Sequence, residues 1–370
     1  MNMPARWKPA VTRTLAAVVS ATMLWTFSAQ ACTSFLLVAK DGSKAYGRTL
    51  EFGVDMKSQI TLLPRGLAMD GSLPNGEKGK PWTARYAALG MNGFGLPIMV
   101  DGLNEKGLAG GMLFFPGYAK FASASGAPKS KALGSWEFLA WALTSYASVA
   151  EVKRAIADGE VVIVDTVQID LGIAPPLHYT LHDTSGASVV IEPIDGKLIV
   201  TENPYTVLTN SPEIAWHQAN LRNYATITPD YPKPVTVLGQ TLVPFSTGSG
   251  MRGLPGDQSS PARYVQAIAF IATLKTPLNA RENVQNAEHI LNHFDLVDGS
   301  AGEYTGIKGQ GRFEITYWTA ISDMSNLRFY YKTYDNQHLR YVDMKDFDLN
   351  AKAATYVSTG QPFAPQKLAF

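Results

Sequence analysis

The chain contains a single cysteine, Cys32, among its 370 residues. One cysteine cannot form an intramolecular disulfide, and it cannot supply a cysteine-rich zinc site. The chain must therefore fold by burying apolar surface. Its composition allows this, because 46% of the residues are hydrophobic and only 17% are charged. At about 150 residues per domain, the length accommodates two domains or one large domain.

The segment before Cys32 is typical of a cleaved export signal. Its first thirteen residues include three basic side chains, and residues 14–27 are largely apolar. Such a stretch is too short to span a bilayer as a helix. Small residues at 29 and 31 then form an A-x-A cleavage pattern directly before the cysteine. We therefore expect residues 1–31 to be a signal peptide. Residues 32–370 would form the exported protein, either periplasmic or secreted.

Two alternatives to this cleavage stay open. The apolar segment could be an N-terminal membrane anchor or a buried helix. A cysteine after the signal could also be lipidated, but that signal usually has an aliphatic residue at the position of Ala29 and a small one at the position of Gln30. No other stretch has eighteen uninterrupted apolar residues, so we expect no stable membrane insertion after cleavage.

Charge and motif content exclude several classes of function. Removing the three basic residues before Cys32 takes the formal net charge from +1 to −2, which leaves no basic surface for nucleic acid. His289 and His293 have metal-ligand spacing, but no glutamate follows the first histidine. The glycine pairs at 93–95 and 309–311 do not follow a clear strand with a helix behind it. We therefore expect no metal and no cofactor.

Cleavage after Ala31 would place a free α-amino group on the residue that carries the thiol. The ordinary pKa values of these two groups, about 8 and about 8.5, make proton exchange between them nearly thermoneutral. An N-terminal amine can serve as the base for its own side-chain nucleophile. The alternative is that a lone cysteine is a small buried hydrophobe. The position of Cys32 at a predicted cleavage point favours the nucleophile.

Strand-like segments in hairpins alternate with helix-like segments along the rest of the chain. Expected strands lie at 32–39, 45–52 and 59–63, in a meander over 178–201 and within 313–343, whereas 64–85 reads as an exposed loop. Expected helices lie at 135–145, from a cap at Ser148, at 260–274 with Ser260 as the cap, and at 279–293. This order indicates an α+β domain with antiparallel sheets, and not a doubly wound parallel fold. We find no internal repeat and no linker, so we expect a single domain over 32–370.

Six ordered motifs resemble those of the choloylglycine hydrolase family. They are Cys32-Thr33-Ser34, G-R-T-L-E at 47–51, D-G-L-N-E-K-G-L at 101–108, L-T-N-S-P at 208–212, L-P-G-D with S-S-P-A-R at 254–263, and the strand sequences of 319–336. The family contains bile salt hydrolases and penicillin V acylases, which are N-terminal nucleophile hydrolases. The resemblance implies a four-layer αββα fold and a homo-oligomer, in this family a homotetramer.

The resemblance also implies roles for individual residues. Cys32 matches the nucleophile, and Arg48 matches the arginine beside it, where a guanidinium favours the thiolate. Glu51 stands where the family usually has an aspartate that accepts from the α-amino group. Asn210 matches the donor to the oxyanion of acyl transfer. Arg263 matches the arginine that supports the nucleophile's network.

Phe114 departs from the family pattern. It stands at the position of the second oxyanion donor, which is asparagine in many bile salt hydrolases and tyrosine in penicillin V acylases. Phenylalanine has no side-chain donor, so only its backbone N–H could serve. We expect Phe114 to border the substrate.

The expected reaction is hydrolysis of a linear, non-peptide amide with a bulky apolar acyl part, so the expected partner is a small-molecule amide. The resemblance offers three substrate classes, namely glycine- or taurine-conjugated bile acids, phenoxyacetyl penicillins and N-acyl homoserine lactones. A papain-like protease is an enzyme alternative, but it would need a helix-borne cysteine and a partnered histidine. A non-catalytic binding protein on the same scaffold is the alternative from a different class.

Overall fold

The computed structural model describes residues 31–302, 313–360 and 364. The predicted signal peptide therefore lies outside the described residues, except for Ala31. Within the described part, no helix is long and apolar enough to cross a membrane.

One antiparallel sheet of five strands contains the predicted N-terminal hairpin. Its strand order is β1 (Thr33–Val38), β2 (Lys44–Phe52), β16 (Ile315–Asp323), β17 (Arg328–Thr333) and β18 (Asn336–Asp343). Thr33 pairs with Thr49 and Ser34 pairs with Arg48 across the hairpin. The predicted hairpin is confirmed, and its register brings Cys32 beside the end of β2.

A second antiparallel sheet of eight strands lies against the first. Its order is β13 (Lys197–Glu202), β12 (Ser188–Ile194), β11 (Leu177–His182), β8 (Ala109–Phe114), β7 (Asp101–Asn104), β6 (Ala88–Met91), β3 (Ile60–Leu63) and β19 (Thr355–Val357). The predicted meander is confirmed as β11, β12 and β13. Contacts of β2 with β8 and of β16 with β7 join the two sheets.

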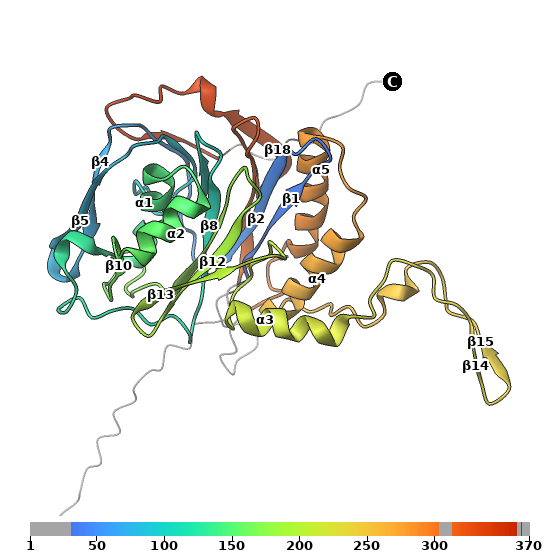
Figure 1. Ribbon diagram of the computed structural model, residues 1–370. Coiled ribbons are helices and arrows are strands. Elements are labelled where there is room, and N and C mark those ends of the chain that lie inside the picture. The colour runs from blue at the N-terminus through green and yellow to red at the C-terminus, as the bar shows by residue number, and fades with distance from the viewer. Residues whose placement is uncertain (1–30, 303–312, 361–363, 365–370) are drawn as a thin grey trace, which may run out of the picture.

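Helices cover the outer faces of both sheets (Figure 1). On one side, α1 (Phe138–Ser145) packs on β7 and β8, and α2 (Val149–Ala157) follows it. On the other side, α4 (Ser260–Thr273) packs on β1, and α5 (Ala280–Leu291) packs on β2 and β16. The fold is therefore α+β with four layers in the order αββα, as the resemblance implies.

The predicted caps of α2 and α5 are confirmed, whereas those of α4 and of the helix expected from a cap at Ser135 are wrong, since Ser135 lies in a 3₁₀ turn before α1. Ser148 caps α2 and Asn279 caps α5, each by accepting a backbone N–H from the residue three positions on. For α4, however, the cap is Ser259, and Ser260 is the first helical residue. The predicted cap was wrong by one position, because either serine of the pair can accept the N–H of the first turn. The hydroxyl of Ser260 therefore does not cap the helix, and it accepts the N–H of Asn210 instead.

The prediction of an exposed loop over 64–85 was wrong. This segment contains the hairpin of β4 (Ala68–Ser72) and β5 (Lys78–Thr83). Gly71 and Gly79 lie where a Cβ would come within 2.5 Å and 2.3 Å of the carbonyl oxygen of Ala132. The glycines permit this close backbone approach, and they also remove the alternating side-chain pattern by which a strand is recognised.

Smaller elements lie outside these layers. Two short strands, β9 (Ala132–Leu133) and β10 (Val162–Ile163), pair in parallel. Helix α3 (Ile214–Asn220) follows the loop that carries Asn210. A hairpin of β14 (Val235–Val237) and β15 (Gln240–Leu242) extends away from the body of the protein (Figure 1).

Candidate active site

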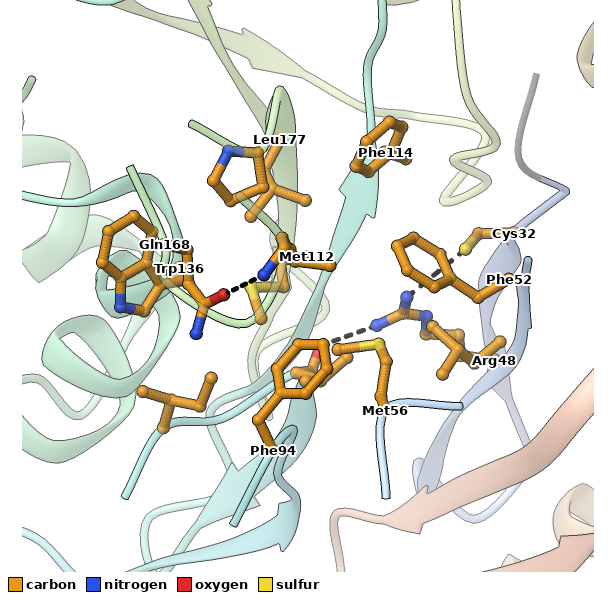
Figure 2. A pocket seen from close by; sticks show the side chains of 15 residues that line it. Cys32, Arg48, Phe52, Met56, Phe94, Met112, Phe114, Trp136, Gln168 and Leu177 are labelled. Carbon is orange, nitrogen blue, oxygen red and sulfur yellow. Dashed lines mark hydrogen bonds between the residues drawn. The ribbon is translucent and has the colours of Figure 1, made fainter. Parts of the chain in front are cut away.

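Cys32 lies directly before β1 and is almost fully buried, with 2% of its surface exposed. Its Sγ accepts a hydrogen bond from Nη2 of Arg48 at 3.5 Å, as the dashed line in Figure 2 shows. The pairing of β1 with β2 places the guanidinium there, because Arg48 lies opposite Ser34. A fixed positive charge at this distance stabilises a thiolate over a thiol.

Arg48 is held in place from several sides. Its Nη1 donates to the carbonyl oxygen of Val100 at 2.6 Å, and its guanidinium lies 5.4 Å from the ring centre of Trp318. Burial opposes the charge of Arg48, but Cys32 and Asp101 outweigh this effect, so the pKa of Arg48 is raised. The guanidinium is therefore a permanent cation beside the sulfur.

Asn210 contacts the backbone of Cys32 from the opposite side. Its Oδ1 accepts the N–H of Cys32 and Nη2 of Arg263, both at 2.8 Å. Two donors at one atom identify that atom as the oxygen, so the amide nitrogen is the other one. This Nδ2 donates to the carbonyl oxygen of Phe114 at 2.8 Å. An amide nitrogen carries two hydrogens, so a second one remains for a substrate oxygen.

Arg263 links the nucleophile to helix α4. Its Nη1 donates to the carbonyl oxygen of Cys32 and, at 2.8 Å, to Oγ1 of Thr33. Its Nε donates to the carbonyl oxygen of Gln258 at 2.9 Å. One buried guanidinium thus fixes Cys32, Thr33 and the side chain of Asn210 relative to each other.

Glu51 is fully buried at the end of β2, with 0% of its surface exposed. One of its carboxyl oxygens accepts from Oγ1 of Thr316 at 2.9 Å. Burial raises the pKa of Glu51 to about 8, although Arg263 opposes the rise. In the part of the chain that the structure describes, no hydrogen bond joins this carboxyl to the Cys32 nitrogen, which donates to Asn210 instead. The expected contact between Glu51 and the α-amine stays a prediction.

Two further buried carboxyl groups at the site were not found from the sequence. Asp101, at the start of β7, has its pKa raised to about 7 by burial, with Arg48 opposing the rise. It begins the motif at 101–108, so the sequence marked its position without indicating a role. Glu314 accepts the N–H of Ala31 at 3.1 Å through Oε2. No sequence pattern points to Glu314.

An apolar pocket opens beside the sulfur of Cys32 (Figure 2). Phe114 lines it, as expected, and its ring packs edge-on against Phe52 with centroids 5.7 Å apart. Among the described lining residues, Cys32, Arg48 and Gln168 have polar side chains, and Trp136 adds an indole N–H. The other described lining residues are Leu50, Met56, Phe94, Ile98, Val100, Met112, Leu171, Pro175 and Leu177. The chemistry of this lining suits an apolar acyl group whose carbonyl lies next to the thiol.

No metal site is evident in residues 31–302 and 313–360. Within these ranges, no group of three or more histidine, cysteine, aspartate or glutamate side chains is placed to bind an ion. His293 instead stacks on Phe270, with ring centroids 4.3 Å apart.

Comparison with known proteins identifies the family. Residues 32–356 match the model of the linear amide C–N hydrolases, choloylglycine hydrolase family. The chain belongs to this family. The resemblance drawn from the six motifs is therefore confirmed, and this choloylglycine hydrolase family member is a hydrolase of linear amide C–N bonds.

Individual relatives cover nearly the same part of the chain. A bile salt hydrolase/transferase from Clostridium perfringens is 31% identical over 326 residues, which are 86% of this chain and 94% of the relative. A solved structure of a conjugated bile acid hydrolase variant from Clostridium perfringens has a TM-score of 0.79 at 29% identity, and covers 91% of this chain and 100% of that chain. A penicillin V acylase from Pectobacterium atrosepticum is 22% identical over 329 residues, 85% of this chain and 81% of that protein.

Proposed function

We propose that this choloylglycine hydrolase family member cleaves an N-acyl amide whose acyl group is apolar, with Cys32 as the nucleophile after residues 1–31 are removed. One observation carries the proposal. The sulfur of Cys32 lies at an apolar pocket within hydrogen-bond reach of the fixed cation Arg48, and the backbone nitrogen of Cys32 donates to the side chain of Asn210.

The arrangement supports the following sequence of steps. The thiolate attacks the amide carbon of the substrate, and the negative charge that develops on the carbonyl oxygen is stabilised by Nδ2 of Asn210. The α-ammonium of Cys32 gives its proton to the leaving amine as the C–N bond breaks. Water then loses a proton to the α-amine and attacks the thioester, which releases the acid and regenerates the thiolate and the α-ammonium. Arg48 places a positive charge beside the sulfur, and Arg263 holds Cys32 and Asn210 together.

The pocket wall favours acyl groups without hydroxyls. Gln168, a polar side chain of the lining away from Cys32 and Arg48, already accepts the N–H of Leu171 at 2.8 Å and donates to Asp170 at 2.9 Å, which leaves the second hydrogen of its amide nitrogen for a ligand. Away from Gln168 and the indole N–H of Trp136, a steroid hydroxyl would enter an apolar surface without a partner, which costs free energy. Bile salt hydrolases are among the relatives, so conjugated bile acids stay candidate substrates. Phenoxyacetyl penicillins and N-acyl homoserine lactones match the apolar wall better.

A substrate panel tests the acyl preference. We expect kcat/KM to decrease as hydroxyls are added to glycine-conjugated bile acids, and to be higher for penicillin V or a long-chain N-acyl homoserine lactone. A preference for the trihydroxylated conjugate would refute this part of the proposal. Binding of the panel without turnover would identify the non-catalytic alternative.

The processing step and the export route belong to the same proposal. The family match begins at residue 32, which supports removal of residues 1–31. We propose that this signal directs the domain over 32–370 to the periplasm or out of the cell. Intact mass and N-terminal sequencing of the exported protein test this. The expected product begins at Cys32 and is not lipidated, and a variant that retains residues before Cys32 is inactive. Full turnover by an uncleaved chain, verified by mass, would contradict the mechanism.

We further propose a homo-oligomer, and a homotetramer by family resemblance, in which the hairpin of β14 and β15 lies on a second copy. An isolated two-stranded hairpin is marginally stable in water. Its turn residue Leu238 is 98% exposed, and Phe245, three residues after β15, is 84% exposed. Changing both residues to serine is expected to lower the mass measured by light scattering. Ile169, 90% exposed but outside the hairpin, provides the matched control as Ile169→Ser.

A further inference from the structure

We infer that His217 is a positioning residue, which together with Ser260 clamps the backbone of Asn210 so that its side-chain amide faces the reacting carbonyl. The inference rests on the proposed function, because that function assigns the oxyanion to Asn210. The evidence is a set of buried hydrogen bonds to the backbone of Thr209 and Asn210.

His217 holds the carbonyl group of Asn210. It lies on α3 with 0% of its surface exposed, and its Nε2 is 3.0 Å from the carbonyl oxygen of Asn210. A carbonyl oxygen only accepts, so Nε2 carries the hydrogen. The imidazole also stacks on Tyr264 of α4, with centroids 4.8 Å apart and an angle of 28° between the rings. The hydrogen bond fixes where Nε2 points, and the stacking on Tyr264 fixes the plane of the ring.

Ser260 holds the N–H group of the same residue. Its Oγ accepts the N–H of Asn210 at 2.8 Å and lies 2.9 Å from Oγ1 of Thr209. Ser260 can do this because Ser259, and not Ser260, caps α4. One residue earlier, Nε2 of His178 contacts the carbonyl oxygen of Thr209 at 3.0 Å. The loop is thus held by side chains from β11, α3 and α4.

The clamp fixes the position of Nδ2 of Asn210, the atom that is proposed to stabilise the oxyanion. With its N–H and its carbonyl both held, the backbone of Asn210 cannot rotate without breaking a buried hydrogen bond. Cys32 and Arg263 fix Oδ1 at the other end of the side chain. The position of Nδ2 follows from these four contacts. An error of about 1 Å in such a position can lower a rate about 100-fold.

His217 acts as a neutral donor and not as an acid or a base. Burial lowers its pKa to about 4, with the carbonyl of Asn210 opposing the shift, nearby His178 and Arg263 adding to it, and Glu192 opposing it. Its charge therefore stays constant across the neutral range. Replacement of His217 is expected to change the rate without moving the limbs of the pH–rate profile.

Two substitutions of His217 separate its N–H from its ring. His217→Phe keeps an aromatic ring against Tyr264 but removes the donor. His217→Gln removes the ring but offers an amide N–H toward the same carbonyl. We expect His217→Phe to lower kcat about 10- to 100-fold with KM within about twofold, since the defect lies in the transition state. We expect His217→Gln to stay within about threefold of the wild-type kcat.

The opposite pattern, an active His217→Phe and an inactive His217→Gln, would show that His217 only fills space and would overturn the inference. Ser260→Ala provides a second variant in case His217→Phe does not fold, and it is expected to lower kcat with unchanged KM. The matched control is His182→Phe, because His182 is equally buried but contacts Thr180. An equal loss of kcat in this control would also overturn the inference.

Asn210→Ala distinguishes failure of this inference from failure of the proposed function. If Asn210→Ala retains full activity, the assignment of the oxyanion to Asn210 is wrong. If Asn210→Ala is inactive while folded His217→Phe and Ser260→Ala are both fully active, the proposed function stands and the clamp is refuted.

Discussion

Replacing the buried carboxyl of Glu51 by an amide is expected to change how stability depends on pH. Glu51 is fully buried, and its pKa rises from the usual 4.5 to about 8 in the folded chain that retains Ala31. A group with a raised folded pKa stabilises the fold fully below its unfolded pKa, and this contribution is lost as the pH rises through the folded pKa. The wild-type protein should therefore lose stability between pH 4.5 and about pH 8.

The size of the effect follows from the same two pKa values. Each pKa unit corresponds to about 1.4 kcal/mol. The rise from 4.5 to about 8 therefore corresponds to a loss of about 5 kcal/mol across this window. Glu51→Gln cannot ionise, so it should lack this loss. The carboxyl of Asp101, whose pKa is raised to about 7, titrates in both proteins and cancels in the comparison.

The assay is urea unfolding of both proteins at pH 5 and pH 9, in chains that retain Ala31. The free energy of unfolding of Glu51→Gln, relative to wild type, is expected to increase by several kcal/mol between the two pH values, about 5 kcal/mol at most. Glu51→Asp is the matched control, because it keeps a titratable carboxyl and should follow wild type. A difference between Glu51→Gln and wild type that is constant to within about 1 kcal/mol would refute the reasoning.

Three further predictions concern the nucleophile and its surroundings. Cys32→Ser should lose at least about 100-fold in turnover and stay folded by circular dichroism, and near-wild-type activity would place the nucleophile elsewhere. Gly111→Ala would put a Cβ 2.4 Å from Oη of Tyr46 and 2.9 Å from Oδ2 of Asp101, so it should lower stability by about 1–3 kcal/mol in urea unfolding, and unchanged stability would contradict this packing. In the processed enzyme the α-ammonium of Cys32 favours the ionised form of Glu51, and this carboxylate in turn raises the pKa of the amine. Glu51→Gln should therefore move the acidic limb of kcat/KM to lower pH, whereas Glu51→Asp should retain the limb. An unchanged limb in folded Glu51→Gln would remove Glu51 from the amine's environment.

Local patterns in the sequence determined the parts of the structure that depend on neighbouring residues. The turn after Lys40 predicted the hairpin of β1 and β2, and the patterns at Ser148 and Asn279 predicted two helix starts. These features form between residues a few positions apart, so the chain carries their signal locally. The same reasoning failed at 64–85, because Gly71 and Gly79 are required by a distant backbone at Ala132.

The arrangement of the site depends on contacts between distant parts of the chain. The sequence marked Cys32, Asn210 and Arg263, and only packing shows that one oxygen of Asn210 joins the other two across separations of 178 and 53 residues. His217 gave no signal in the sequence, because its role depends on a helix and a loop that meet in space. Such contacts form only when the helices and sheets pack together. Each polar group that is buried in this packing needs a hydrogen-bond partner, and residues close to it in the sequence do not supply one.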